Sequence, residues 1–278
     1  ITDLCGSGSG GESDNLKVYN GATANATNIK SFTATGDTQN LGTATLTAIS
    51  TGGTIDMSSA SGSAVYTIIG GAGTDNLKGD DGNDTFKIVA STEGNSDTID
   101  GDGGSANTLD VSSGTHVLTD NSKIINIHNI TLNNSTINLT NQTEGFTITG
   151  HTGGDIITGG DGNDTYTINK DQGAVIYEAP NQGYNDRLVL NGISFNSPDS
   201  YYLFIDGRHI LFGNIPNTQG VLVLDALDSL DSSLNTYSAG IDFIQLDDAA
   251  YVADSLIRSL YYESYNYGGY LGSYSFSY

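Results

Sequence analysis

The sequence predicts an all-β protein that winds as a parallel β-roll or β-solenoid with calcium-binding turns, followed by a C-terminal β-rich cap and one short helix. Two observations lead to this prediction. A nine-residue pattern of glycine and aspartate occurs four times in two tandem pairs, and an apolar residue recurs at intervals near nine along most of the chain. A short repeat of this kind buries its apolar face only by stacking on its neighbours, and such stacking produces a solenoid.

The four repeats cover residues 70–78, 79–87, 150–158 and 159–167. Each has glycine at its first and fourth positions, aspartate at the sixth and an apolar or aromatic residue at the eighth. Glycine allows tight turns with positive φ, so main-chain carbonyl groups can face a common point. Aspartate adds a short carboxylate, and ligation by oxygen at about 2.3–2.6 Å suits Ca²⁺. Ordinary Gly/Asp-rich turns are the simpler alternative, but they do not require both residues in phase four times.

Several Ca²⁺ ions are therefore expected, held by these turns and by degenerate repeats beside them. Asp97 is expected to stack over Asp75, and the region of Asp102 and Asn107 over Asp84. A last partial repeat after the second pair adds one further aspartate. The predicted metal-site residues are Gly71, Gly73, Asp75, Asp80, Gly82, Asp84, Asp97, Asp100, Asp102, Gly153, Asp155, Gly160, Gly162, Asp164 and Asp186.

The recurring apolar position is expected to form the core. It continues through residues 111–149, where Gly-Asp loops are rare, and there rungs of Asn, Ser and Thr are expected to stack through side-chain hydrogen bonds. The positions are Phe32, Leu41, Ile49, Met57, Ile68, Leu77, Phe86, Ile99, Leu109, Leu118, Ile127, Ile137, Phe146, Ile157 and Tyr166.

Three parts are expected along the chain. Residues 1–65 form Thr/Ser-rich solenoid rungs, 66–190 form the calcium-binding roll, and 191–278 form the cap and a C-terminal signal. A separate β-sandwich over 1–65 is the alternative for the first part. In residues 1–65 the predicted strands are 16–19, 29–35 and 43–49, and clusters of Gly, Asn and Ser separate them.

The sequence of the cap predicts a hairpin, two more strands and a helix. Residues 202–212 read as a hairpin around Asp206-Gly207, a pair that favours a type I′ turn. Residues 220–225 and 241–246 are expected strands. A helix is then expected to begin at Asp247 or Asp248, and its apolar face would contain Ala249, Val252, Ala253, Leu256, Ile257, Leu260 and Tyr261.

The charge of the chain argues against several partners. The formal net charge is -23, from 32 acidic and 9 basic residues. Such a charge is unfavourable for binding nucleic acid or an anionic membrane, and it opposes compaction unless cations neutralise it. The single cysteine, Cys5, cannot form an internal disulfide. No segment approaches the roughly 20 apolar residues of a membrane span, and no apolar leader follows Ile1, so the chain is expected to be part of a longer protein.

No motif indicates catalysis, and we expect no enzyme activity. The four histidines form no His-Glu-x-x-His metal helix. A Gly-x-Ser-x-Gly elbow and a P-loop are also absent from the sequence.

The nonapeptides, the cap segment 241–246 and an uncleaved C-terminal signal occur in the order found in RTX proteins. The chain thus resembles the C-terminal part of such a type I-secreted bacterial protein over residues 66–278. Segments 13–18 and 28–32 are similar in texture to bacterial surface-layer (S-layer) proteins. The resemblance implies a secreted or cell-surface location and recognition by a type I exporter.

Three function classes follow from this resemblance. The first is a structural protein of a bacterial surface layer, folded and assembled into an array by Ca²⁺, with cell-surface polysaccharide as a further expected partner. The second is the export and folding domain of an RTX enzyme or toxin. The third is the terminal domain of a large adhesin.

Overall fold

The computed structural model describes residues 15–62, 65–89, 95–151, 153–169, 172–178, 183, 185–192, 202–206, 209–214, 219–224, 241–247 and 250–252. Over these residues the protein is all-β, with strands stacked as a parallel β-solenoid, as predicted. The chain divides into two units, Ile1–Thr131 and Leu132–Tyr278. Among the described residues, no helix is long and apolar enough to cross a membrane.

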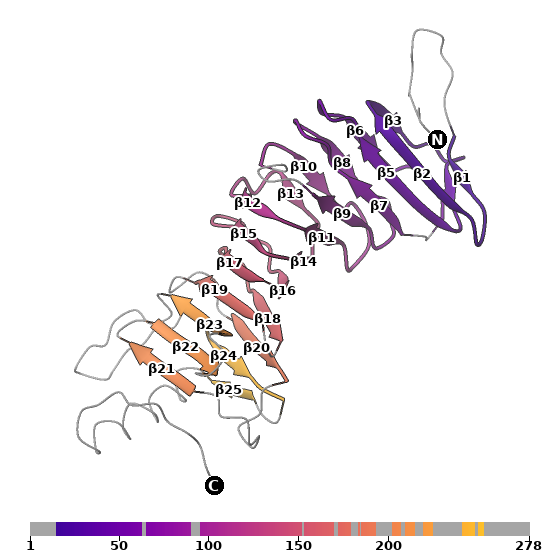
Figure 1. The fold of residues 1–278 in the computed structure, drawn as a ribbon. Helices are drawn as coiled ribbons and strands as arrows, with labels where there is room; N and C mark the ends of the chain where they lie inside the picture. Colours follow the sequence, from indigo (N-terminus) through magenta and orange to yellow (C-terminus); the bar gives the residue numbers. More distant parts are fainter. Residues whose placement is uncertain are drawn as a thin grey trace, which may run out of the picture. The chain divides into compact units, whose positions relative to one another are not determined.

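Unit 1 contains two rows of parallel strands (Figure 1). The first row, in order, is β2 (Thr23–Ile29), β5 (Thr43–Ala48), β7 (Tyr66–Ile69), β9 (Thr85–Ile88) and β11 (Thr108–Val111). The second is β3 (Ser31–Thr33), β6 (Thr54–Asp56), β8 (Asn76–Lys78), β10 (Thr98–Asp100) and β13 (Ile124–Ile125). The remaining strands are β1 (Lys17–Val18), which pairs with β4 (Gln39–Asn40), β12 (Gly114–Val117), and β14 (Asn129–Leu132) at the boundary of the units.

Unit 2 also contains two rows of strands and ends with antiparallel strands. One row is β16 (Thr147–Gly150), β18 (Thr165–Asn169), β20 (Arg187–Asn191), β24 (Phe243–Gln245) and β25 (Ala250–Val252). The other is β15 (Ser135–Asn138), β17 (Gly154–Thr158), β19 (Gly173–Tyr177), β23 (Gln219–Leu224), β22 (His209–Asn214) and β21 (Tyr202–Asp206). Pairing becomes antiparallel from β23 to β21 and from β24 to β25.

The core consists of apolar side chains stacked in register along each row. Period-two alternation sends one side chain of each short strand inward and its neighbours outward. In the second row of unit 1 the stack is Phe32, Ile55, Leu77, Ile99 and Ile124, each at most 1% exposed. Burying side chains of this size stabilises the fold by about 1.5–3 kcal/mol each. The nine-residue recurrence therefore corresponds to real core positions over most of its length.

The predicted recurrence is wrong at two positions. Leu41 is 48% exposed and Ile49 is half-buried. The core residue of this rung is Leu46, which is fully buried and pairs with Ile68. The reason is that Leu41 lies in the turn between β4 and β5, so the alternation begins only at Thr43.

The strands of the N-terminal part pair directly with those of the first repeats. β5 is parallel to β7, and β6 is parallel to β8. The described residues before Tyr66 therefore continue the solenoid and do not form an antiparallel sandwich of their own. The predicted strand 43–49 is observed as β5, whereas β2 was not predicted, because its Thr, Asn and Ala side chains carry little apolar signal.

The cap differs from the prediction in its hairpin turn and its helix. The hairpin is present, but Asp206, which was expected in the turn, belongs to the first strand and pairs with His209; the turn itself lies outside the described residues. The helix prediction is wrong at Ala250–Val252, which form a strand antiparallel to β24. Pairing with the open edge of β24 satisfies backbone groups that a helix would leave unpaired at this edge. The rest of the predicted helix lies outside the described residues.

Candidate metal centre

The position-six aspartates of the four repeats lie inside the turns. Asp75, Asp84, Asp155 and Asp164 are each at most 1% exposed. In each turn Oδ1 accepts the backbone N–H of the residue in register one coil earlier, and Oδ2 accepts the N–H of the residue four positions back. The tight turns can therefore be buried without unpaired backbone donors.

The distances are similar in all four turns. The Oδ1 bonds come from Gly53 to Asp75 (2.6 Å), Tyr66 to Asp84 (2.7 Å), Ser135 to Asp155 (2.9 Å) and Phe146 to Asp164 (2.8 Å). The Oδ2 bonds come from Gly71 to Asp75 (2.7 Å), Asp80 to Asp84 (2.8 Å), His151 to Asp155 (3.2 Å) and Gly160 to Asp164 (3.2 Å).

The carboxylates also form ladders along the stack of coils. The Asp75 N–H donates to Asp97 Oδ1 at 2.8 Å, so the predicted stacking of Asp97 over Asp75 is observed. The Asp84 N–H donates to Asn107 Oδ1 at 2.8 Å, which places the Asn107 region over Asp84 as predicted. In unit 2 the equivalent ladder connects Asp164, Asp186 and Asp242, with bonds of 2.8 and 2.9 Å. Whether these aspartates ligate a metal remains a prediction.

Removing one capping carboxylate should destabilise the solenoid strongly. Asp84→Ala leaves the buried N–H groups of Tyr66 and Asp80 without their acceptor. Each of the two unsatisfied groups costs about 1–3 kcal/mol, so the free energy of unfolding should fall by about 2–6 kcal/mol. Urea unfolding in millimolar calcium measures this loss. Asp81→Ala removes an exposed carboxylate from the same turn and should change stability little; equal losses in the two variants would contradict the capping role.

The predicted glycines serve the close packing of the turns. Gly73 and Gly153 have φ of 124° and 108°, which disfavours any residue with a side chain. A side chain at Gly160 or Gly162 would collide with backbone carbonyls of the preceding coil. Gly82 donates its N–H to Asp80 Oδ1 at 2.7 Å.

Asp80, Asp100 and Asp102 have different environments. Asp80 is buried, and desolvation raises its pKa to about 6, with the charges of Asp84 and Asp81 acting in the same direction. Asp100 and Asp102 are half-buried and flank the ammonium group of Lys78, at 3.3 and 2.8 Å. A single basic side chain of the protein is thus shared by these two predicted ligands and offsets part of their negative charge.

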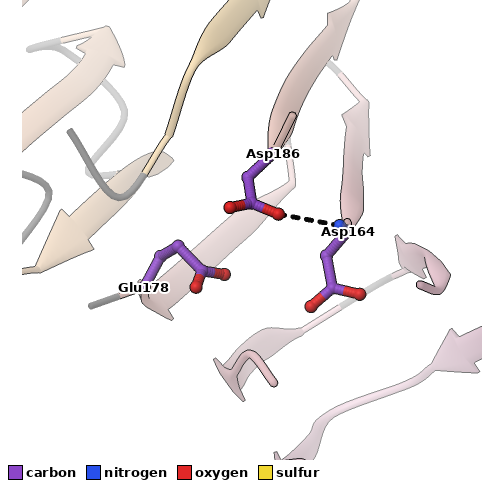
Figure 2. A group of neighbouring side chains, drawn as sticks. All are labelled: Asp164, Glu178 and Asp186. Carbon is purple, nitrogen blue, oxygen red and sulfur yellow. Dashed lines mark hydrogen bonds between the residues drawn. The ribbon is translucent and has the colours of Figure 1, made fainter. Parts of the chain in front are cut away.

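Unit 2 brings three carboxylates together in its interior. Asp164, Glu178 and Asp186 are at most 1% exposed, and their ligand atoms lie within 4.8 Å of one another. Figure 2 shows the three side chains around one space, each from a different segment of the chain. In the described part of the protein, no other three His, Cys, Asp or Glu residues approach each other this closely. We call these residues the acidic triad.

Glu178 reaches the triad because the neighbouring coil has a glycine beside it. Thr158 pairs with Tyr177, so Gly159 stands next to Glu178. A side chain at Gly159 would collide with both the Glu178 carboxylate and the Tyr166 hydroxyl. Tyr166 donates its O–H to Glu178 Oε2 and lies 3.4 Å from Asp164 Oδ2. The other oxygen, Glu178 Oε1, is buried without a hydrogen-bond partner in the described residues.

Burial strongly disfavours three negative charges in this space. Desolvation raises the pKa of Asp164 to about 6 and that of Asp186 to about 7. The pKa of Glu178 rises to about 10, first through desolvation and then through the charges of Asp186, Asp164 and Asp242. Hydrogen bonds from Phe146, Gly160 and the Asp164 N–H act in the opposite direction but are outweighed. A proton or a cation must therefore compensate the triad.

The donor set fits a hard cation. It offers carboxylate oxygens and one phenolic oxygen, and the ion pairs of the described residues, made by Lys78 and Lys87, all lie in unit 1. Oxygen ligands with several negative charges are what Ca²⁺ prefers. The unpartnered Glu178 Oε1 gives such an ion an available ligand. Asp164, Asp186 and Glu178 would hold it.

The sequence predicted Asp164 and Asp186 as metal-site residues but missed Glu178. Glu178 occupies the position that glycine holds in the repeat, so the nine-residue frame gave no reason to select it. Its signal is a glutamate directly after the alternating strand 173–177, one coil beyond the last repeat. Asp242 was missed because it is 56 residues from Asp186 in the chain.

No protein-family model matches this chain, and a search of curated proteins finds no match. The fold and the site by themselves define an all-β parallel solenoid with a buried acidic triad that could hold a metal ion.

Proposed function

We propose that the chain is an extracellular structural protein of a bacterial surface layer, which Ca²⁺ folds and assembles after type I secretion. The acidic triad is the observation that carries this proposal. Three buried carboxylates within 4.8 Å of one another destabilise the folded state unless a positive charge joins them. A cell exterior with millimolar calcium supplies that charge, whereas a cytosol poor in calcium leaves the chain expanded for export.

The remaining charge supports the same proposal. A net charge of -23 opposes compaction, and the faces of a polar solenoid with few basic residues repel one another. Calcium bridging exposed aspartates of neighbouring molecules reverses this repulsion. Each such bridge is worth only about 1 kcal/mol or less, so a repeating array is needed for a stable assembly. No active site is part of this proposal.

The tandem repeats favour a second candidate, the calcium-binding export and folding domain of an RTX enzyme or toxin, or of a large adhesin. Both candidates require calcium-linked folding. They differ in what happens once folding is complete, because only the surface-layer protein continues to associate as calcium rises.

Circular dichroism during a calcium titration should show the β signal develop at about 0.1–1 mM, the range of extracellular calcium modules. At tenfold excess over Kd, each site adds about 1.4 kcal/mol, so several sites are expected to act together. Light scattering above the calcium level that completes folding then tests assembly, with magnesium as the control ion. A full β signal in EGTA would rule out calcium-linked folding. Monomers at all calcium levels would favour the second candidate.

A further inference from the structure

The coil at residues 101–107 replaces the position-six aspartate with Asn107. Its Oδ1 accepts the Asp84 N–H at 2.8 Å, as an aspartate of the ladder would. The loop from Gly101 to Asn107 is one residue longer than the loop from Gly79 to Asp84 in the preceding coil. Asn107 is fully buried, so all of its polar atoms must be satisfied by the protein.

The amide nitrogen of Asn107 lies among three backbone carbonyl groups. Nδ2 donates to Gly101 O at 3.2 Å, to Gly103 O at 2.6 Å and to Asn126 O at 3.0 Å. The orientation of the amide is unambiguous, because Oδ1 is needed to accept the Asp84 N–H. In the aspartate coils, the residue four positions back presents its N–H to the side chain. Here that residue, Gly103, presents its carbonyl group instead.

Convergent carbonyl oxygens beside a position-six side chain are the ligands that a hard cation uses. Two turns supply these carbonyl groups. Their backbone is left-handed at Asp102, Gly104 and Asn126, with φ of 56°, 78° and 56°. A side chain at Gly101 would collide with the Asn107 amide and the Asn126 carbonyl, so the amide fills the available space. The positive end of the amide therefore occupies the point where a cation would otherwise sit.

We propose that the carbonyl groups of Gly101, Gly103 and Asn126 form a latent site for a divalent cation, and that Asn107 determines whether it binds one. With asparagine the site is closed, because the side-chain NH₂ takes the place of the ion. With aspartate, Oδ2 would face three carbonyl oxygens, and a shared cation would relieve their repulsion when the carboxylate is ionised. In the same coil, the Lys78 ammonium group lies between the carboxylates of Asp100 and Asp102. The protein therefore supplies positive groups here from two of its own side chains, the Asn107 amide and Lys78.

The test is the calcium stoichiometry of the full chain with Asn107→Asp. Equilibrium dialysis should show one more bound Ca²⁺ per chain than in the unaltered protein, and folding of the variant should require more calcium. Asn107→Ala removes the amide without adding a carboxylate and should bind no additional ion. A folded Asn107→Asp variant with unchanged stoichiometry would overturn the proposal. This comparison is independent of the triad, because it measures an increment over whatever number of ions the unaltered protein binds.

A second measurement needs no variant. In the calcium-saturated protein, NMR should find the side-chain amide protons of Asn107 protected from exchange at least tenfold more than those of the exposed Asn83. If calcium occupied the three carbonyl groups, it would displace the amide and its protons would exchange freely. That result would overturn the proposal even if the Asn107→Asp variant failed to fold.

Discussion

Glu178→Gln should allow the protein to keep its β structure in EGTA under conditions where the unaltered chain loses it. With a pKa near 10, Glu178 must bind a proton at neutral pH when no cation is present. The ordinary pKa of a glutamate is near 4.5, so holding that proton at pH 7 costs about 3 kcal/mol. Glutamine has the shape of the protonated acid and avoids this cost. The same change removes one of three carboxylates from the triad. The calcium concentration needed to stabilise the fold should therefore rise at least tenfold.

The measurement is urea unfolding, followed by circular dichroism, in EGTA and in millimolar calcium. Asp161→Asn is the matched control, because it removes an exposed carboxylate close to Asp164. The control should lower neither stability nor calcium response appreciably. A Glu178→Gln variant that is less stable in EGTA and responds normally to calcium would show that Glu178 is no part of a cation site.

Acid should replace calcium as the stabiliser of unit 2. The folded-state pKa values of Asp164, Asp186 and Glu178 are all raised above their ordinary values of 3.8, 3.8 and 4.5. For an acid whose pKa is raised by folding, the stabilising effect of the proton is complete below the unfolded pKa and is lost as pH rises through the folded pKa. In EGTA, stability should therefore be highest near pH 4 and fall by several kcal/mol as pH rises through about 6 and 7 toward 10.

Calcium should reverse the sign of this dependence over pH 5–8. The ion binds deprotonated carboxylates, so protons compete with it and stability should rise with pH when calcium is abundant. Urea midpoints at several pH values, in EGTA and in calcium, measure both slopes. Slopes of the same sign in the two solutions would mean that calcium does not bind the titrating carboxylates. Asp75, Asp84 and Asp155, whose pKa values are also raised by burial, should add to the slope in EGTA.

The strands themselves could be predicted wherever the local sequence determines the backbone conformation. The repeats combine glycine for tight turns with one apolar residue in each short strand, and both requirements are local. Leu77, Phe86, Ile157 and Tyr166 are therefore buried where the frame placed them. The frame failed at Leu41, because an extra turn changes the spacing there without any change in composition.

The acidic triad depended on register between distant parts of the chain. Asp164 and Asp186 could be recognised from the repeat, but Glu178 joins them only because β19 pairs with β17 and places it against Gly159. Asp242 reaches the ladder only because β24 pairs with β20, although Asp242 is 56 residues from Asp186 in the sequence. Local patterns carry no information about such pairings.

The sequence by itself determined that this chain is a parallel β-solenoid whose turns bury aspartates, since glycine spacing, strand alternation and carboxylate capping act within one or two coils. Only the tertiary structure decided how each buried charge is compensated. Lys78 offsets part of the charge of Asp100 and Asp102, the Asn107 amide lies where we propose that a cation would otherwise bind, and within the described residues no Lys or Arg forms an ion pair with Asp164, Glu178 or Asp186. The physical reason is that desolvation and Coulomb interactions depend on distances across coils, which strand register sets and which a single repeat does not contain.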